Sequence, residues 1–582
     1  MEQTAGKRAW LCVIIAFVAM LLVGLIVFDD YGFSFDEEVQ RQHALISYRT
    51  VARMLSGREV FSDAGPSLTD YEYKYYGVAM QLPLVFAEDM YQLSTGTPMP
   101  MRTVYRMRHL YTFLIYWFAL VCFYRMLRRM FDSPWLALAG VCMVYLFGRF
   151  FAQSCYNIKD MLFTSLFMIA LYCAERVFAT KRKPLWCVLF AVSGALLVTS
   201  RIVGALLIVL VLAAMLIEDI ASARAAGRGE TGEAIAQASL WRRLLPYLLI
   251  CGAYPVWILV TPAAWRDPVG FSLGYVFRFS NYTAWRGFFP FFDRLINIGG
   301  ADNMRVPRGY LIAWIALTVP IVNQLLCAGG IAGFLAARVR GLVRRERDFG
   351  ARTTMLTLML LMLVGTLFYQ FAFQPVVYDG WRHAFFLYPV MIAFAVYALS
   401  AVWTQARAKK RAWMGVAVSG ALMASLVCNA VSIAANHPYE FMSYNAVGRA
   451  YAEYLARDYW GVANYNALKW LTEHCDEETI LVAGTDSAQY PPETFDAFRS
   501  YTDNTELLLA TVNSYVFEHD AYLLPAEQSA RISICAYPDA TYLLQNYTRT
   551  PGVNALAPAG YEEIYAIEAY GVKLLSILKR AG

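Results

Sequence analysis

Residues 9–28 read AWLCVIIAFVAMLLVGLIVF, and Ser34-Phe35-Asp36-Glu37-Glu38 follows shortly after them. The apolar stretch carries no charge and is long enough to cross a bilayer as one helix. Lys7 and Arg8 precede it, and basic residues favour the cytoplasmic side. The acidic cluster is therefore expected on the opposite side, at the start of a loop over residues 29–108. Carboxylates at that boundary do little for membrane stability and suit chemistry on a lipid-linked substrate.

The composition is that of a multi-pass membrane protein. Of 582 residues, 58% are hydrophobic and 16% are charged, and the mean hydropathy is +0.41, which is too apolar for a soluble globule of this size. The 14 Trp, 39 Tyr and 36 Phe are typical of several spans with aromatic belts at their ends. The net charge of +6 collects in the predicted cytoplasmic loops. It therefore indicates orientation rather than nucleic-acid binding.

Hydrophobic segments predict about eleven transmembrane helices. They are expected at residues 9–28, 109–127, 134–149, 161–178, 185–200, 202–218, 244–262, 309–335, 353–374, 384–403 and 413–434. With a cytoplasmic N-terminus, all five cytoplasmic loops are basic. Their cations are Arg125/Arg128/Arg129, Lys181/Arg182/Lys183, Arg224/Arg228/Arg242/Arg243, Arg338/Arg340/Arg344/Arg345/Arg347/Arg352 and Arg407/Lys409/Lys410/Arg411.

The remaining segments form the extracytoplasmic side. Residues 1–434 are predicted to be a transmembrane catalytic domain, and residues 435–582 an extracytoplasmic mixed α/β domain. Within that domain the pattern favours a helix over 463–474 and a strand over 479–483. Two cysteines of this domain, Cys475 and Cys535, lie in a compartment where a disulfide can form.

Asp36 and Glu37 are the first candidates for chemistry. Ser34 and Glu37 have the spacing of a capping box that opens a helix, and acidic residues are favoured in a first turn. Capping accounts for Ser34 and Glu37 but does not require Asp36. Asp36 is therefore the stronger candidate for a catalytic carboxylate.

A second acidic position lies in the outer turn Tyr156-Asn157-Ile158-Lys159-Asp160. A helix-starting Asp is commonly a cap, and that alternative stays open for Asp160. The turn nevertheless places a carboxylate and the Lys159 cation on the same membrane face as Asp36. Such a pair suits a site that orients an acceptor and neutralises a phosphate.

Further cations are expected at the same face. Arg201, between two spans, departs from the basic-inside pattern, although a snorkelling arginine at a helix end explains it equally well. Arg382 and His383 follow Tyr378-Asp379-Gly380-Trp381 and suit phosphate binding, with a local Asp379–Arg382 pair as the alternative. In the first loop, Lys74 lies in the segment Tyr71–Gly77, whose tyrosines include Tyr75 and Tyr76 and could stack on sugars or anchor at the interface.

This combination resembles the glycosyltransferase C superfamily, which includes the protein O-mannosyltransferases and the aminoarabinose transferases of lipid A. The resemblance rests on Asp36-Glu37 after the first span, on Asn157–Asp160, on Arg382–Pro389 at the start of a late span, and on His437–Asn445 after the last span. The resemblance covers the membrane part of the chain, about 445 residues, through short motifs rather than one long signature.

The resemblance implies an inverting transfer of a sugar from a polyprenyl-phosphate donor to an acceptor hydroxyl on the outer face of the plasma membrane. Asp36 would be the general base, with Glu37 and Asp160 beside it. The donor phosphate would be bound by Arg201, Arg382, His383, Lys74 and Lys159, and the substrates by Tyr75, Tyr76 and Asn157. Cations can stabilise the leaving phosphate, so no metal cofactor is expected.

Several alternatives and identities stay open. A transporter or flippase of lipid-linked glycans would require charged residues near the middle of the membrane, and a membrane-anchored assembly scaffold would not need the outer carboxylates. The acceptor could be a protein, a lipid or a cell-envelope glycan, and the sugar is undetermined. The sequons at Asn281 and Asn546 have meaning only in a eukaryotic host, whereas the resemblance favours a bacterial membrane.

Overall fold

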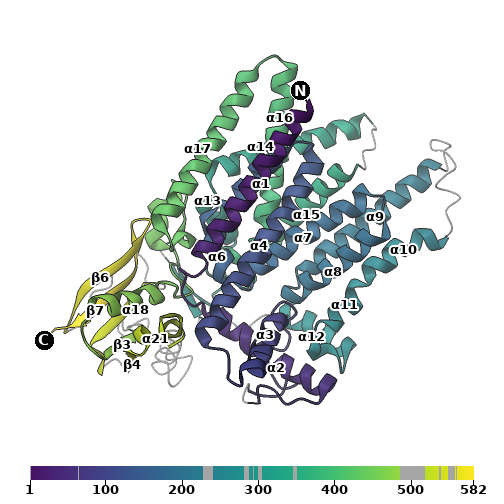
Figure 1. Cartoon of the computed structure of the whole chain (residues 1–582). Helices are drawn as coiled ribbons and strands as arrows, with labels where there is room; N and C mark the ends of the chain where they lie inside the picture. The colour runs from purple at the N-terminus through teal and green to yellow at the C-terminus, as the bar shows by residue number, and fades with distance from the viewer. Residues whose placement is uncertain are drawn as a thin grey trace.

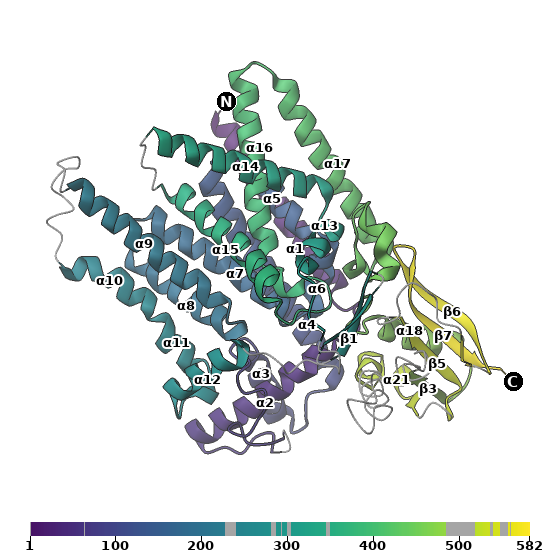
Figure 2. The ribbon, with the colours of Figure 1, turned by 180° about the vertical axis from the view of Figure 1, so that it is seen from behind.

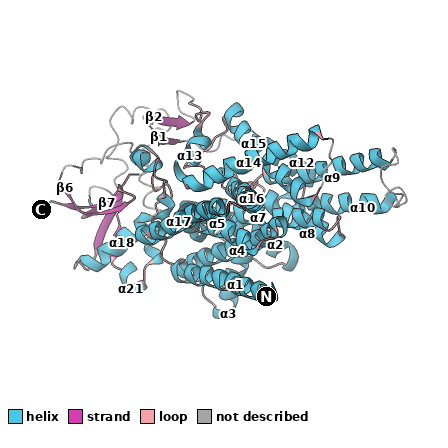
Figure 3. Cartoon of the chain, turned by 90° about the horizontal axis from the view of Figure 1, so that it is seen from above, coloured by secondary structure: helices cyan, strands magenta, loops and turns pink. Residues whose placement is uncertain are grey.

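The computed structural model describes residues 2–62, 65–226, 240–280, 287–292, 294–298, 304–344, 350–484, 518–535, 539–547, 557–558 and 560–581. Most of the described chain is a bundle of long helices, with a small sheet at one end of it (Figure 1). Viewed from above, the strands lie at one edge of the molecule and the helices fill the rest (Figure 3). The chain is a polytopic α-helical membrane protein with a C-terminal α/β region.

The helices of the membrane part run in chain order through residues 2–436. Their bounds are α1 (Glu2–Val27), α2 (Phe35–Ser56), α3 (Leu82–Thr95), α4 (Met101–Phe131), α5 (Pro134–Tyr145), α6 (Gly148–Tyr156), α7 (Asp160–Ala179), α8 (Pro184–Ser200), α9 (Gly204–Ala226), α10 (Leu240–Cys251), α11 (Ala253–Leu259), α12 (Pro268–Ser280), α13 (Tyr310–Thr318), α14 (Ile321–Val343), α15 (Ala351–Phe373), α16 (Leu387–Ala408) and α17 (Ala412–Asn436), with 3-10 turns η1 (Pro262–Ala264) and η2 (Arg382–Ala384).

Among the described residues, eight helices are long and apolar enough to cross a membrane, namely α1, α4, α7, α9, α14, α15, α16 and α17. Seven of the eight match predicted spans, and α14 overlaps the second half of the span predicted at 309–335. The other three predicted spans are also helical but differ in form. The span predicted at 134–149 covers α5 and the first two residues of α6, and these two helices form a pair bent by 68°. The span at 185–200 is α8, with 17 residues. The span at 244–262 is divided into α10 and α11 at Gly252.

The predicted continuous span 309–335 is wrong in one respect, because two helices replace it. Helix α13 ends at Thr318 and α14 begins at Ile321. Pro320 is the N-cap of α14, and Val319 has extended backbone angles of φ −69° and ψ 136°. A proline disfavours the helical conformation of the residue before it, and hydropathy does not detect this break.

Helices α7 and α16 form the centre of the bundle. Their apolar windows are 83% and 67% buried, whereas those of α1 and α17 are 22% and 17% buried. Close packing is visible at Gly330 of α14, where a Cβ would come within 1.9 Å of the Phe394 carbonyl oxygen of α16. The chain enters these two helices, the most buried of the eight spans, directly after Lys159 and shortly after Arg382.

The C-terminal region (residues 435–582) continues from α17. It contains η3 (Glu440–Met442), η4 (Gly448–Tyr454), α18 (Ala463–His474), β3 (Ile480–Gly484), α21 (Ala526–Ser529), β4 (Ile532–Ile534), β5 (Tyr542–Asn546), β6 (Tyr561–Ala569) and β7 (Val572–Arg580). The helix predicted over 463–474 is confirmed, and the strand predicted over 479–483 is β3. Cys475 and Cys535 are both free thiols.

The sheet of this region has the order β4-β3-β5-β7-β6. Strand β3 is parallel to β4 and β5, and β7 pairs antiparallel with β5 and β6. In register, Val482 lies beside Tyr542, and Leu543 lies beside Leu578. A separate antiparallel hairpin joins β1 (Gly287–Phe291) to β2 (Arg294–Ile298). Of the sequons, residues 281–283 and Thr548 lie outside the described residues.

The C-terminal region, α2, α3 and α12 lie at the same end of the bundle, away from the N-terminus (Figures 1 and 2). The turn between α16 and α17 lies at the opposite end, with the N-terminus. This arrangement agrees with the predicted separation of basic loops from the loops that carry the candidate residues. The site is therefore sought where α2, α7 and α16 begin.

Candidate active site

The first turn of α2 separates Asp36 from Glu37. The backbone N–H of Ser34 donates to the Glu37 carboxylate at 2.9 Å, and the Ser34 hydroxyl donates to the Tyr156 carbonyl at 3.2 Å. Glu37 is fully buried and lies 3.2 Å from His109 Nε2. Asp36 instead keeps 18% of its side chain exposed. Glu37 thus holds the helix start in place, whereas the Asp36 side chain stays partly exposed.

Asp160 is the second carboxylate of the site and is held by its own turn. The Asn157 side-chain oxygen accepts the backbone N–H groups of Lys159 at 3.2 Å and Asp160 at 2.8 Å. The cap considered for Asp160 is therefore not formed by its own side chain, and Asn157 accepts these two N–H groups instead. This leaves the Asp160 carboxylate free to pair, and it is bound by Arg382 Nη1 at 2.6 Å and by Arg201 Nη2. Asp160 is fully buried, so a pair of arginines balances its charge.

Arg382 connects the two carboxylates. Its Nη1 atom lies 2.6 Å from Asp160 and 3.7 Å from Asp36, and its Nε lies 3.2 Å from Asp379 without hydrogen-bond alignment. Only 2% of the side chain is exposed. Burial opposes the charge of the guanidinium, but Tyr378, Asp36 and Asp379 outweigh it and raise the pKa of Arg382. Arg382 therefore remains a cation beside both acids.

Lys159 and Arg201 supply two more cations. Lys159 Nζ lies 4.0 Å from Asp36 and 4.6 Å from the centre of the Tyr76 ring. Burial lowers the pKa of Lys159 from 10.5 to about 8, although the Asp36 carboxylate acts in the opposite direction. Burial and then the Arg382 charge lower the pKa of Arg201 to about 10. Lys159 is therefore the cation of this cluster whose charge changes nearest to neutral pH.

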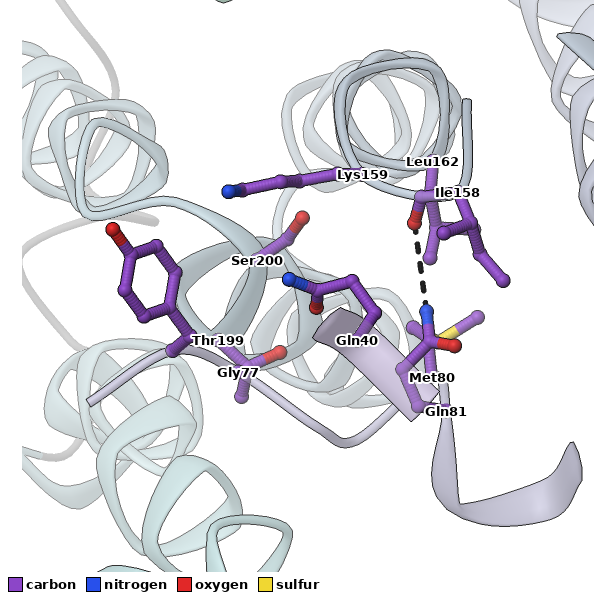
Figure 4. Close-up of a pocket in the computed structure, with 10 residues that line it drawn as sticks. Gln40, Gly77, Met80, Gln81, Ile158, Lys159, Leu162, Thr199 and Ser200 are labelled. Carbon is purple, nitrogen blue, oxygen red and sulfur yellow. Dashed lines mark hydrogen bonds between the residues drawn. The ribbon is translucent and has the colours of Figure 1, made fainter. Parts of the chain in front are cut away.

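A pocket opens beside Lys159, with an empty volume of about 330 Å³ that includes its solvent-facing part. Figure 4 shows the Lys159 ammonium, the Ser200 hydroxyl and the Gln40 amide gathered around one space. Tyr76, Gly77 and Thr199 also contribute to the wall. At the far side, Gln81 donates to the Ile158 carbonyl oxygen at 3.5 Å (Figure 4). The pocket therefore combines a cation with neutral hydrogen-bonding groups, which is the chemistry that binds a phosphate.

The three acids and three cations form one cluster. Asp36, Asp160 and Asp379 contact Lys159, Arg201 and Arg382, and burial raises the pKa of Asp379 to about 6 against the opposing Arg382 and Arg149 charges. Asp36 Oδ2 is buried, and within the described residues it makes no hydrogen bond. Its nearest cations are 3.7 and 4.0 Å away. Asp36 therefore keeps one carboxylate oxygen without a hydrogen-bond donor among the described residues, whereas both carboxylate oxygens of Asp160 are bound by arginines.

Some of the predicted residues lie apart from this cluster. Lys74 donates to the Thr69 carbonyl and lies 5.9 Å from the ring centre of Tyr75. Tyr75 packs on Phe271 of α12, with a ring separation of 5.1 Å. Of the predicted first-loop tyrosines, Tyr76 is the one that lines the pocket. No contact of the described residues joins Lys74 or Tyr75 to the carboxylates.

His383 lies next to Arg382 but has a different character. Its ring is 5.0 Å from that of Tyr378. Burial, followed by the charges of Arg382, Arg201 and Lys159, holds the pKa of His383 well below its usual range. The imidazole is therefore neutral and can act only as a neutral donor or acceptor.

Several residues of the site were not predicted. Asp379 was predicted only as a local partner of Arg382; that ion pair is present at 3.2 Å, but the place of Asp379 in the wider cluster was not predicted. Gln40 and Ser200 carry no sequence signal beyond their proximity to predicted residues. Tyr459 and Trp460 lie against Arg382, with ring centres 5.1 and 4.5 Å from the guanidinium carbon. Their position depends on tertiary contacts between distant parts of the chain.

A metal site was also sought. Within the part of the chain that the structure describes, no group of three or more His, Cys, Asp or Glu side chains is arranged to hold a metal ion. The cations that contact the carboxylates are instead Lys159, Arg201 and Arg382. Metal independence remains a prediction.

No family model matches the chain, and no curated protein matches its sequence significantly. Among solved structures, ArnT from Cupriavidus metallidurans bound to undecaprenyl phosphate is 12% identical, with a TM-score of 0.44 and 97% of each chain covered. The archaeal oligosaccharyltransferase AglB from Archaeoglobus fulgidus, in complex with an inhibitory peptide and a dolichol-phosphate, is 12% identical, with a TM-score of 0.41. That comparison covers 91% of this chain and 69% of the other. At such TM-scores the likenesses do not extend to function.

Proposed function

We propose that this protein is an integral membrane glycosyltransferase that moves a sugar from a polyprenyl-phosphate donor to an acceptor hydroxyl at the extracytoplasmic face. The observation that carries the proposal is the state of Asp36. Its side chain is 18% exposed, its buried Oδ2 makes no hydrogen bond within the described residues, and Lys159 and Arg382 lie within 4.0 Å. That arrangement suits a base next to a site for a departing anion.

In the proposed reaction one proton is transferred, one bond forms and one bond breaks. Asp36 accepts the proton of the acceptor hydroxyl as its oxygen forms a bond to the anomeric carbon. The bond from that carbon to the phosphate oxygen breaks, and polyprenyl phosphate leaves with the electron pair. A carboxylate is a weak base for a hydroxyl, so the proton moves late in an oxocarbenium-like transition state. In-line displacement with a single carboxylate at the attacking side gives inversion.

The cations divide the remaining work. Lys159 lines the pocket and is close to Asp36, so it would meet the phosphate as its negative charge grows. Arg201 and Arg382 are both bound by Asp160, which orients them. Asp160 is therefore proposed as an orienting carboxylate, since both of its oxygens are occupied by arginines. Binding of the donor phosphate by Lys74 and of a substrate by Tyr75 remain predictions.

The transporter alternative fits the charge distribution less well. It requires charged residues near the middle of the membrane. Buried charged side chains of the described spans instead lie near helix ends, as with Arg108 in α4 and Glu175 in α7. Glu175 is paired with Arg129 at 3.2 Å. These positions favour structural pairing over a conduction path.

The proposal is tested with purified protein and a panel of radiolabelled polyprenyl-phosphate sugars, each offered with glycan, lipid and peptide acceptors. We expect wild-type protein to consume one donor and release polyprenyl phosphate. Asp36→Asn should remove this activity by about 10²- to 10⁴-fold while donor binding persists, since the base is lost and the shape is kept. The control is Glu72→Gln, because Glu72 is an exposed carboxylate whose side chain is 67% accessible.

A further inference from the structure

The C-terminal region presents two aromatic rings to the candidate site on a fixed turn. The Asp458 carboxylate accepts the backbone N–H groups of Val462 at 3.0 Å and Ala463 at 2.7 Å, at the start of α18. Gly461, inside this turn, has a φ of +72°, a conformation that favours glycine. The turn therefore sets the direction of Tyr459 and Trp460 before they meet the membrane part.

Both rings lie against Arg382. The guanidinium carbon is 4.5 Å from the ring centre of Trp460, 5.1 Å from that of Tyr459 and 4.8 Å from that of Tyr378. A guanidinium so placed is attracted by each ring and is restricted to one orientation. Two of these three rings come from the C-terminal region. The group that bridges Asp36 and Asp160 is thus covered by rings that follow it by 77 and 78 residues in the sequence.

A second contact from the same region reaches the chain just before Asp36. The Asp520 carboxylate oxygen accepts the Phe33 backbone N–H at 2.8 Å, and the His519 ring stacks on Phe33 with centres 4.6 Å apart. A Cβ on Gly32 would lie 2.6 Å from the Val462 carbonyl oxygen. The segment that leads into α2 is therefore packed closely between the bundle and the C-terminal region.

Asp520 is fully buried, and its surroundings do not stabilise a negative charge. Burial raises the pKa of Asp520 well above its usual range, against the hydrogen bond from Phe33. The carboxyl group therefore acts through the oxygen that accepts this hydrogen bond. An amide of the same shape would provide the same acceptor.

We infer that the C-terminal region is a working part of the candidate active site, with Asp520 and Trp460 as positioning residues that hold the start of α2 and the Arg382 guanidinium. Asp520 sets the main chain three residues before Asp36, and Trp460 sets the cation 3.7 Å from the Asp36 carboxylate. The inference rests on the proposed function for its catalytic part. Its structural part, that these contacts hold α2 and Arg382, stands independently.

The test compares full-length variants in pairs. Asp520→Ala removes the acceptor of the Phe33 N–H, whereas Asp520→Asn keeps it. Trp460→Ala removes the ring over Arg382, whereas Trp460→Phe keeps an aromatic face. Glu518→Ala is the matched control, because Glu518 lies two residues before Asp520 in the same helical turn and is exposed.

Two readouts are needed. Hydrogen exchange followed by mass spectrometry reports the amides around Phe33 and needs no donor. We expect exchange there to rise by about tenfold in Asp520→Ala and to stay near wild type in Asp520→Asn and Glu518→Ala. In the transfer assay, kcat should fall by about 10- to 100-fold in both alanine variants with less change in KM, since misplaced groups fail in the transition state.

The outcomes separate the two claims. Unchanged exchange at Phe33 in Asp520→Ala overturns the inference, whatever donor is used. Faster exchange with an unchanged kcat also overturns it, because the contact would then be structural only. If wild-type protein consumes no donor, the proposed function fails, while the exchange comparison still decides whether Asp520 holds α2. Should Asp520→Ala fail to fold, the Trp460 pair gives the same decision from kcat and its rescue by phenylalanine.

Discussion

The charge of Lys159 should produce an alkaline limb in the pH–rate profile. Its pKa is about 8, whereas Arg201, with a pKa of about 10, keeps its charge across the same range. His383, with a pKa well below its usual range, is neutral throughout. A rise from pH 7 to pH 9 therefore removes one cation from the cluster, and that cation is Lys159.

The magnitude follows from the titration. At pH 9, one unit above a pKa of about 8, about one tenth of the Lys159 side chains remain protonated. If only the cation supports departure of the phosphate, kcat/KM should fall about tenfold for each unit above pH 8. Lys159→Arg keeps its charge and should move this limb upward by more than one unit. Lys159→Met should lower the plateau and abolish the limb.

The free energy of unfolding should rise with pH over the range in which kcat/KM falls. The folded-state pKa of Lys159 lies below its ordinary value of 10.5, so the unfolded chain binds more protons between about pH 8 and 10.5. This group therefore destabilises the fold below about pH 8, by about 3 kcal/mol on the scale of its pKa difference, and that cost is relieved as pH rises. Lys159→Met should consequently raise the thermal unfolding temperature at pH 7 while it lowers activity.

The assay measures kcat/KM for donor consumption between pH 6 and 10, and thermal unfolding is followed in the same preparations. Samples returned to pH 7 after exposure to each pH serve as controls that exclude irreversible loss of activity. A profile whose alkaline limb is identical in wild type and Lys159→Arg would refute the reasoning. A lowered unfolding temperature for Lys159→Met at pH 7 would refute the assignment of Lys159 as a buried cation held at a cost.

Three further predictions follow from close contacts. Gly77→Ala should destabilise the loop beside the pocket by about 1–3 kcal/mol and weaken donor binding, measured by unfolding and by binding of a labelled lipid phosphate, because a Cβ would lie 1.7 Å from the Thr199 carbonyl oxygen. Asp379→Asn should remove an acid limb near pH 6 in the rate profile, since protonation of Asp379 weakens its pairing with Arg382; an unchanged limb would contradict this. Gly330→Ala should lower the unfolding temperature by opening the contact between α14 and α16, with donor affinity retained in the folded fraction.

The spans could be predicted because hydropathy is a local property. Residues 9–28 and 413–434 read as apolar runs and are the helices α1 and α17. Breaks were missed where one residue decides the backbone, as at Val319 before Pro320. The bend between α5 and α6 was likewise missed, because the predicted span ends at Arg149, near the start of α6, and no proline separates the two helices. Hydropathy thus gives the number of segments better than their continuity.

The site could be predicted in part for a similar reason. Topology places Asp36, Asp160 and Arg382 at one face, and the structure brings their side chains together. Topology does not determine which group pairs with which. Asp160 is bound by both Arg201 and Arg382, and Lys74 lies outside the cluster. Such pairings depend on side-chain packing over long sequence separations.

The two aromatic rings over Arg382 could not be predicted from the sequence. Tyr459 and Trp460 directly follow Asp458, and a Tyr-Trp pair near a membrane is typical of residues that anchor at the interface. Only the fold shows that they face a cation from the loop before α16. The sequence pattern therefore indicated the membrane face and the acids, but not the part of the chain that completes the site.

The most direct test of the central claim is release of polyprenyl phosphate from the donor that wild-type protein consumes, measured for wild type, Asp36→Asn and Glu72→Gln together with donor binding. The account predicts wild-type turnover in Glu72→Gln and a loss of about 10²-fold or more in Asp36→Asn, with donor binding kept in both. Turnover in Asp36→Asn within about threefold of wild type would contradict Asp36 as the base, since a positioned general base contributes far more than this.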